Sequence, residues 1–383
     1  MIKTVFLLCI FCSMISNLMG QKRSIGPEDY KTWRTISSPL MSQDASVLGY
    51  QAKPLEGDAT LYLFQRAKSK LDSFQRGEGL RYNLNSDLAV FKITPGFDTL
   101  RTLKLKKVKK NKWPKDSLCI WNLRDDTLVK VSGLKKYALS KEGNTLCYLT
   151  NSTVKAKGWK PFSKAKPSRK VNKLHVYTAY PNIFLVLEGV TDFRLSDDGN
   201  RLAVLKELTI DKKKSYSILV YDLRSKNPVR EFDQAEKFKL SRWSESTDKF
   251  AFYQSQDTSL ENYELYVYDF KTNKSTIIGA EFIESLNYGD SLPSIHQKPL
   301  FSKDEQNMVF GISKKLSEAP KDSLLAEEKF SVDVWHYLDQ KIQPQQLKGV
   351  KREKKKSDWF LYSFKDKTLR KLNNDTLSLS FDD

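Results

Sequence analysis

Residues 195–205 read LSDDGNRLAVL, a polar turn that runs directly into an apolar strand. Asp and Gly accept tight-turn conformations, while the flanking apolar residues pair across the turn. The same phrase recurs along the chain as an apolar residue, then Ser or Asn, then an acidic residue and often Gly. Its copies contain Ser42 and Asp44, Asn85 and Asp87, Ser140 and Gly143, Ser196, Asp198 and Gly199, and Ser302 and Asp304, with a degenerate copy at Ser241. Repeated copies of one hairpin indicate repeated copies of one structural unit.

A second phrase of alternating apolar and aromatic residues follows each copy of the first. Residues 219–223 read LVYDL and residues 265–270 read LYVYDF, and both lead through polar residues into another strand. Each unit therefore holds about four strands. Four-stranded units at roughly 40 to 50 residues, lengthened by loops, are typical of propeller blades. The sequence thus predicts an all-β fold, a β-propeller of four-stranded antiparallel blades, with an irregular β-solenoid as the alternative.

The repeats divide the chain into a leader and one propeller. Residues 1–20 are predicted to be a signal peptide and residues 21–383 the propeller. About six blades are expected, at approximately 38–75, 80–132, 134–188, 190–234, 236–279 and 282–372. Residues 377–383 read LSLSFDD and match the opening of a further copy, so the series is expected to be incomplete at the carboxyl end.

The last predicted blade contains a long interval rich in lysine. Residues 332–337 alternate well enough to be a buried blade strand. Residues 318–329 and 350–356 lack that period and are expected to project from the sheet as excursions.

Composition indicates a folded, strongly basic protein. Hydrophobic residues make up 39% of the chain and aromatic residues 12%, which is ample for a β core. The formal net charge of +19 is concentrated in runs at 104–112, 155–173, 212–214 and 348–356. Such runs are either solvated loops or surfaces that attract anionic partners. No nucleic-acid partner is expected.

The first 20 residues have the layout of a secretory signal peptide, with Lys3, an apolar run over 5–15 and a polar to small ending before Gln21. The apolar run is shorter than the roughly 20 residues of a membrane span, so cleavage near Gly20 is favoured over a retained anchor. Phe11 before Cys12 disfavours a lipoprotein. The mature protein is therefore expected to be periplasmic or secreted, without a membrane span.

Two cysteines, Cys119 and Cys147, remain in the predicted mature chain. Both lie in strand-like runs, where a buried free thiol is common. An oxidising compartment would also permit a disulfide between them, and the sequence leaves both alternatives open.

No catalytic residue, cofactor or metal site is expected. A nucleophile elbow reads G-x-S-x-G. The nearest strings, at 289–293 and 311–315, both lack the second Gly. His175, His296 and His336 have no neighbours at metal-ligand spacing.

Several segments together carry a family resemblance: DYKTWR at 29–34, EGDATLY at 56–62, KLKKVKK at 104–110, PKDSL at 114–118, VDVWH at 332–336 and QPQQL at 343–347. In this order they resemble the exported prolyl-oligopeptidase-family serine peptidases of Bacteroidota. The resemblance implies an amino-terminal β-propeller that limits substrate access to an α/β-hydrolase domain with a Ser-Asp-His triad. No position of this sequence matches a member of that triad.

The leading prediction is a non-catalytic propeller that gates or docks peptide substrate for a serine peptidase whose α/β-hydrolase domain is missing from this chain. The alternative is a free-standing periplasmic propeller that binds a protein or an envelope partner. A third hypothesis is binding of anionic polymers through the basic runs at 104–112 and 351–356. Strong loss of binding with added salt would favour the third.

Overall fold

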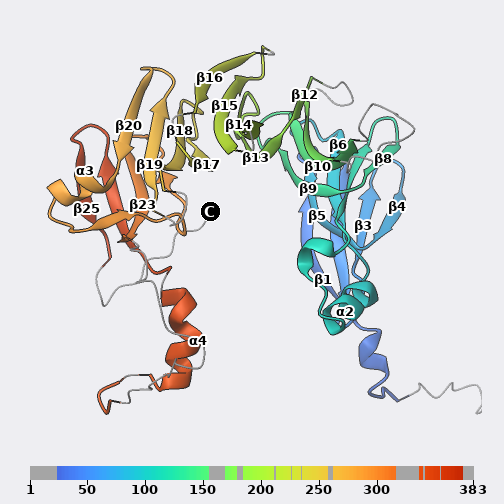
Figure 1. Cartoon of the computed structure of the whole chain (residues 1–383). Helices are drawn as coiled ribbons and strands as arrows, with labels where there is room; N and C mark the ends of the chain where they lie inside the picture. The colour runs from blue at the N-terminus through green and yellow to red at the C-terminus, as the bar shows by residue number, and fades with distance from the viewer. Residues whose placement is uncertain are drawn as a thin grey trace, which may run out of the picture. The chain divides into compact units, whose positions relative to one another are not determined.

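The computed structural model describes residues 24–154, 169–178, 184–210, 213–225, 227–233, 235–257, 262–315, 336–339, 341–353 and 355–373. The chain divides into two compact units, residues 1–80 with 91–114 and residues 81–90 with 115–383. Strands dominate the described part of both units (Figure 1). The helical elements are η1 (Asp29–Lys31), α2 (Phe97–Leu105), η2 (Lys110–Lys112), α3 (Ala280–Ser285) and α4 (Gln343–Glu353).

The described strands form six antiparallel sheets, each made from strands that are consecutive in the chain. Sheet 1 contains β1 (Arg34–Met41), β2 (Val47–Pro54), β3 (Thr60–Gln65) and β4 (Lys70–Gln75). Sheet 2 contains β5 (Gly77–Tyr82), β6 (Leu88–Ile93), β7 (Ser117–Asn122) and β8 (Thr127–Val131). Sheet 3 contains β9 (Leu134–Leu139), β10 (Leu146–Val154), β11 (Arg169–Tyr177) and β12 (Leu185–Glu188).

The remaining sheets follow the same order. Sheet 4 contains β13 (Val190–Leu195), β14 (Arg201–Ile210), β15 (Lys213–Asp222) and β16 (Pro228–Phe232). Sheet 5 contains β17 (Lys237–Trp243), β18 (Lys249–Ser255), β19 (Glu264–Asp269) and β20 (Lys274–Ile278). Sheet 6 contains β21 (Ser291–Pro293), β23 (Asn307–Lys314), β24 (Asp358–Ser363) and β25 (Thr368–Lys371), and the short β22 (Leu300–Phe301) also pairs with β23. Four-stranded meanders in series are the blades of a β-propeller, which confirms the predicted fold class.

The second strands are buried on both faces, because successive side chains of a strand point to opposite sides of its sheet. In β14, Leu202 and Val204 belong to the apolar cluster shared with sheet 3. Ala203 and Leu205 of the same strand belong to the cluster shared with sheet 5. Similar clusters lie between sheets 2 and 3 and between sheets 5 and 6. Within the second unit, sheets and apolar layers therefore alternate.

Short links carry the chain from one sheet to the next. Arg76, Gly133 and Gly189 each stand between a fourth strand and the following first strand, with φ of 63°, 74° and 74°. The carbonyl of each link accepts a hydrogen bond from a backbone amide in, or directly after, the second strand of the following sheet, namely those of Thr94, Asn151 and Glu207 respectively. Two of the three links are glycine, the residue that adopts positive φ without strain.

The predicted strand at 332–337 is wrong at its carboxyl end. Tyr337 lies in a turn with 88% of its surface exposed, and residues 332–335 lie outside the described residues. An alternation over six residues is too short a pattern to separate a strand from a loop. Within the expected excursion at 350–356, residues up to Glu353 belong to helix α4. The predicted opening of a further blade at 377–383 also lies outside the described residues.

No helix in the described part of the chain has the length and apolar character that crossing a bilayer requires.

Candidate functional site

A polar turn joins the first and second strands of sheets 1 to 5, and a similar turn joins β22 to β23 in sheet 6; we call these six segments the first turns. In the turn of sheet 4, the Ser196 hydroxyl accepts a hydrogen bond from the Arg201 amide at 2.9 Å and donates to the Asp198 carboxylate. Asp198 also accepts from the Asn200 amide at 3.0 Å. Although burial acts in the opposite direction, hydrogen bonds from Ser196 and Asn200 hold the pKa of Asp198 below its ordinary value.

Three other first turns repeat this arrangement around Ser42, Ser140 and Ser302. Each hydroxyl accepts a hydrogen bond at 3.0 Å from the amide five residues later. Asp44 and Asp304 accept hydrogen bonds from the hydroxyls of Ser42 and Ser302, as Asp198 does from Ser196. The side chain at the start of each turn thus closes that turn through local hydrogen bonds, and the role of these residues is structural.

In sheets 2 and 5 the structure places the leading position at residues other than those aligned from the sequence. Asn83, not Asn85, takes the place of the serine, because its amide oxygen accepts hydrogen bonds from Leu88 at 2.9 Å and from Asp87 at 3.2 Å. In sheet 5 the Ser244 hydroxyl accepts from the Lys249 amide at 3.0 Å. Ser241, the residue aligned from the sequence, lies within strand β17.

The fourth residue of the first turns is held in the left-handed region in five of the six described copies. These residues are Ala45, Ser86, Gly199, Thr247 and Glu305, with φ from 53° to 76°. Gly143 holds the same position in sheet 3 without a positive φ. A Cβ there would lie 2.4 Å from the Asp198 carbonyl oxygen, so this glycine permits a close approach of two turns.

The first turns of sheets 3 to 6 are joined by one repeated side-chain contact, which we call the turn latch. The residue five positions after the one that opens a turn donates to the carbonyl of the fourth turn residue in the next sheet. Thr145 Oγ1 donates to the Gly199 oxygen at 2.8 Å. Arg201 Nη1 donates to the Thr247 oxygen at 2.7 Å, and Lys249 Nζ donates to the Glu305 oxygen at 3.2 Å. Three chemically different side chains therefore make the same hydrogen bond between neighbouring turns.

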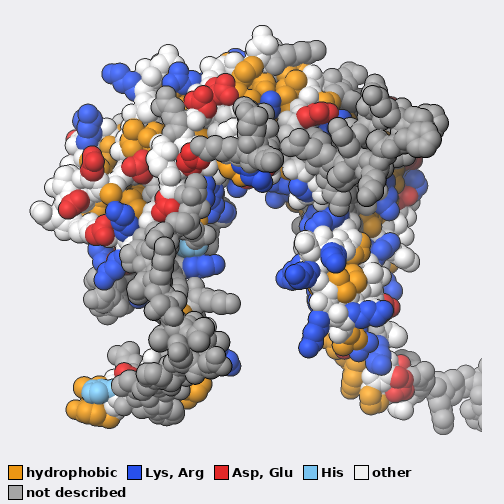
Figure 2. All heavy atoms as spheres, viewed as in Figure 1, with side chains coloured by type: hydrophobic (Ala, Val, Ile, Leu, Met, Phe, Trp, Pro, Cys, Tyr) orange, Lys and Arg blue, Asp and Glu red, His pale blue; other side chains and the backbone are white. Residues whose placement is uncertain are grey.

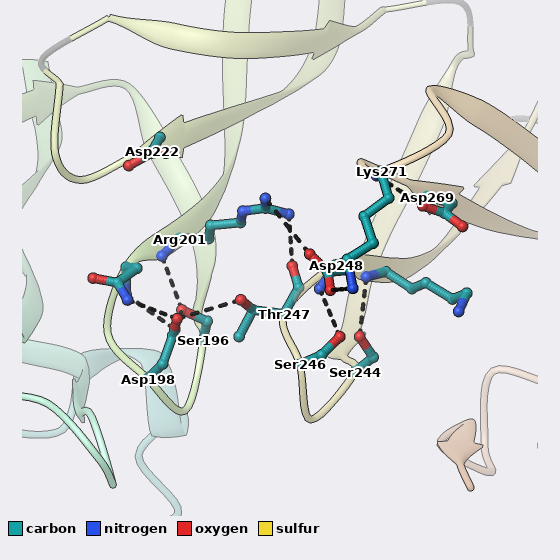
Figure 3. A network of polar contacts seen from close by, with 12 residues as sticks. Ser196, Asp198, Arg201, Asp222, Ser244, Ser246, Thr247, Asp248, Asp269 and Lys271 are labelled. Carbon is teal, nitrogen blue, oxygen red and sulfur yellow. Dashed lines mark hydrogen bonds and ion pairs between the residues drawn. The ribbon is translucent and has the colours of Figure 1, made fainter. Parts of the chain in front are cut away.

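The latch between sheets 4 and 5 lies in a wider polar network (Figure 3). Thr247 Oγ1 donates to Asp198 Oδ2 at 3.3 Å, and Arg201 Nη2 lies 3.9 Å from Asp248 Oδ1. Lys271 Nζ contacts the other oxygen of Asp248 at 2.6 Å. These bonds tie the first turn of sheet 4 to that of sheet 5.

Replacing Thr145 by valine is expected to lower the free energy of unfolding by about 1–3 kcal/mol, because the buried Gly199 carbonyl loses its hydrogen bond while the side-chain volume is kept. Thr145 is 5% exposed. Urea denaturation measures the change. Thr127→Val, at an exposed position of β8, is the control and should change stability by less than about 0.5 kcal/mol. Equal changes in the two variants would contradict a role for the latch.

The first strands of sheets 3, 4 and 5 carry a row of cationic side chains, each of which contacts a carbonyl of the next sheet or of the segment that leads into it. Each first strand is an edge of its sheet. Lys136 Nζ donates to the Phe193 carbonyl at 2.6 Å, Arg194 Nε to the Ser241 carbonyl at 3.0 Å, and Lys239 Nζ to the Ile295 carbonyl at 2.9 Å. We call the row formed by β9, β13 and β17 the first-strand face. Cationic side chains on exposed edges also discourage pairing with other chains.

The first-strand face has a strong excess of positive charge. Asp192 is the acidic residue within these three strands. The cationic residues are Lys135, Lys136, Arg194, Lys237, Lys239 and Arg242. Such a row creates a positive potential that raises the local concentration of anionic ligands. The basic runs of the sequence predict charged loops or anion-binding surfaces at 104–112, 155–173, 212–214 and 348–356, whereas the cations of the first strands carry no separate signal in the sequence.

Asp192 lies between two of these cations, 2.6 Å from Lys136 and 3.2 Å from Arg194. Burial raises the pKa of Asp192 to about 6, although the hydrogen bond from the Phe193 amide acts against this. The folded state therefore binds the proton more tightly than the unfolded chain does. Its contribution to stability is complete below the ordinary pKa near 3.8 and is lost as the pH rises through about 6.

Replacing Asp192 by asparagine should therefore flatten the decline of stability between pH 4 and 7 by about 1–2 kcal/mol, a range that allows for the partial exposure of the carboxylate. Urea denaturation at several pH values measures this. Asp197→Asn, at an exposed position of the same sheet, serves as the control. A variant of Asp192 with the same pH profile as the unaltered chain would show that this carboxylate does not titrate in the range.

Ser291 and Ser313, the serines of the two near-matches to a nucleophile elbow, lie in paired strands of sheet 6, with Lys314 opposite Ser291 and Leu292 opposite Ser313. Ser291 belongs to β21 and Ser313 to β23, both regular strands. His175 stacks on Tyr148 with ring centroids 4.9 Å apart. Burial, with Lys173 nearby, lowers the pKa of His175. Among the described residues, no group of three or more His, Cys, Asp or Glu side chains is placed to hold a metal ion.

Cys119 and Cys147 are both buried free thiols. Burial raises the pKa of each, with a small opposing effect of Lys130 on Cys119. Cys119 lies in β7 of sheet 2 and Cys147 in β10 of sheet 3, and their unpaired state agrees with the free-thiol alternative. Inert thiols in an apolar environment are packing residues rather than nucleophiles.

Known structures include several with a detectable likeness to this chain. The β-propeller domain of the trilobed protease from Pyrococcus furiosus has 10% identity and a TM-score of 0.39, over 74% of this chain and 80% of that one. Acylaminoacyl peptidase from Pyrococcus horikoshii has 10% identity and a TM-score of 0.39, over 74% of this chain and 43% of that one. TolB from Acinetobacter baumannii has 12% identity and a TM-score of 0.29, over 65% and 55%.

The chain thus spans less than half the length of the acylaminoacyl peptidase. No family model matches the sequence, and no characterised protein matches it significantly. The fold is therefore assigned from the sheets described above.

Proposed function

We propose that this chain is a non-catalytic propeller module that docks or gates peptide substrate for a serine peptidase domain. The observation that carries the proposal is the first-strand face, where three neighbouring edge strands hold six cationic side chains and one acidic side chain. Peptides with acidic side chains or a free carboxyl terminus suit such a surface, because complementary charge steers their encounter and fixes their orientation.

The sequence resemblance to prolyl-oligopeptidase-family peptidases supplies the wider setting. In that setting the partners are a peptide substrate and an α/β-hydrolase domain. The leader-like residues 1–20 support export to the periplasm or the outside of the cell. The propeller supplies binding and the partner domain supplies the nucleophile.

A charge reversal at the first-strand face tests the docking proposal. Binding of a fluorescent glutamate-rich peptide to the whole chain is measured by anisotropy at low salt. Lys239→Glu should weaken binding by roughly fivefold to tenfold, because it places a negative charge in the row. Lys274→Glu, at the opposite edge of the same sheet, is the matched control and should have less than about a twofold effect. Equal effects, or no binding by the unaltered chain, would overturn the proposal.

A further inference from the structure

A segment between β23 and β24 exposes an unusual amount of apolar surface. We call residues 336–339, 341–353 and 355–356 the α4 segment. Five of its apolar side chains are strongly exposed: Tyr337 at 88%, Leu338 at 68%, Ile342 at 57%, Leu347 at 62% and Val350 at 41%. Figure 2 shows hydrophobic side chains gathered at the end of this segment, at the lower left of the view. Contiguous exposed apolar side chains mark an interaction surface more often than a solvated loop.

Local hydrogen bonds hold these side chains in a defined arrangement. The Asp339 carboxylate accepts a hydrogen bond from the His336 amide, and the Asp339 amide donates to the His336 carbonyl at 3.0 Å. His336 Nδ1 accepts from the Leu338 amide at 3.2 Å. Gln346 Nε2 donates to the Lys341 carbonyl at 2.7 Å, which joins helix α4 to the residues before it. The turn and the helix therefore present their apolar residues together.

The α4 segment is also basic. Its acidic residues are Asp339 and Glu353. Its cationic residues are Lys341, Lys348, Lys351, Arg352, Lys355 and Lys356. In α4, Leu347 and Val350 are three residues apart and share a face, while Lys348 falls on the neighbouring face. An apolar surface surrounded by cations is complementary to an anionic lipid surface, where side chains enter the headgroup boundary and cations meet lipid phosphates.

The pattern favours a membrane surface over a groove on a protein. Helices that bind in grooves present anchors at positions i, i+3 or i+4, and i+7. Helix α4 offers two apolar anchors, Leu347 and Val350, and the other exposed apolar residues lie in the turn before it. The result is a shallow apolar layer on one segment.

We propose that the α4 segment attaches the protein to the surface of an anionic phospholipid membrane. Attachment is peripheral and reversible, because the apolar side chains enter only the headgroup boundary and the segment does not cross the bilayer. The proposal is independent of peptide docking, because the α4 segment contains no residue of the first-strand face.

Sedimentation of the whole chain with vesicles tests the proposal. One vesicle type is phosphatidylcholine alone, and the other contains about one-third phosphatidylglycerol. The unaltered chain should bind the anionic vesicles at least about tenfold more strongly, and added salt should weaken this binding. Leu338→Ser combined with Ile342→Ser should reduce binding about tenfold, and so should Lys348→Gln combined with Lys355→Gln and Lys356→Gln.

Matched variants elsewhere separate this site from general stickiness. Leu128→Ser with Val129→Ser alters two exposed apolar residues of β8. Lys104→Gln with Lys106→Gln and Lys107→Gln removes three exposed cations from another basic run. Both should bind within about twofold of the unaltered chain. Equal binding to both vesicle types, no binding to either, or equal losses in the control variants would overturn the proposal.

Discussion

Replacing Glu305 by alanine is expected to lower the free energy of unfolding by about 3–5 kcal/mol, one of the two largest effects anticipated in this chain. Glu305 is 8% exposed, and its carboxylate accepts hydrogen bonds from the Ser246 amide at 2.7 Å and the Ser246 hydroxyl at 2.9 Å. Lys249 Nζ lies 3.6 Å from the same carboxylate. The substitution removes the carboxylate from beside a half-buried cation and leaves a turn amide without its acceptor, so the contact between the first turns of sheets 5 and 6 is weakened.

Urea denaturation of the whole chain measures this effect. Glu245→Ala is the matched control, because Glu245 is exposed and precedes Ser246 in the same first turn. We expect it to change stability by less than about 0.5 kcal/mol. A loss below about 1 kcal/mol for Glu305→Ala would mean that this connection between turns does not stabilise the fold.

Replacing Phe310 by alanine is expected to cost about 3–5 kcal/mol, because it removes a large side chain from a closed apolar layer. Phe310 is 0% exposed and lies with Tyr253, Ile312 and Phe360 in the cluster between sheets 5 and 6. Surrounding strands are fixed by their ladders and cannot fully fill the cavity. Chemical denaturation again gives the value.

Phe97→Ala removes the same atoms from a residue that is 40% exposed at the start of helix α2. It should cost less than about 1 kcal/mol. Equal losses for Phe97→Ala and Phe310→Ala would show that sheets 5 and 6 are not packed as described.

The repeated turn was the part of the fold that the sequence could predict. Ser42, Ser196 and Ser302 are each followed two residues later by an aspartate, and this pair is visible as a pattern because one geometry requires both residues. The alternation of the strands then indicated four-stranded antiparallel sheets. Local turn chemistry and strand period are both written in short stretches of sequence.

The predicted positions of the repeated turn were wrong where a different side chain makes the same hydrogen bonds. The amide oxygen of Asn83 accepts the hydrogen bonds that a serine hydroxyl accepts elsewhere, and the turn at Ser244 has Ser246 in place of the aspartate. Gly143 and Gly199 hold the same position within their turns, each for a different reason. Gly199 has a positive φ, whereas Gly143 has a carbonyl of another turn against it.

The turn latch and the first-strand face could not be predicted, because both depend on contacts between sheets. Thr145, Arg201 and Lys249 share a position but no chemistry, and each donates to a backbone carbonyl that any residue possesses. At Tyr337 the sequence pattern predicts a strand, whereas the structure has a turn. Its segment alternates as a strand would, yet the side chain is exposed, since a short alternation contains no information about a pairing partner.

Photo-crosslinking of bound peptide tests directly whether the first-strand face docks peptide. A glutamate-rich peptide carrying a photoreactive phenylalanine analogue is bound to the whole chain, irradiated, and mapped by mass spectrometry after digestion. We expect crosslinks within β9, β13 and β17 that disappear when unlabelled peptide is added in excess. Crosslinks that fall equally on the fourth strands β12, β16 and β20, or that persist under competition, would contradict it.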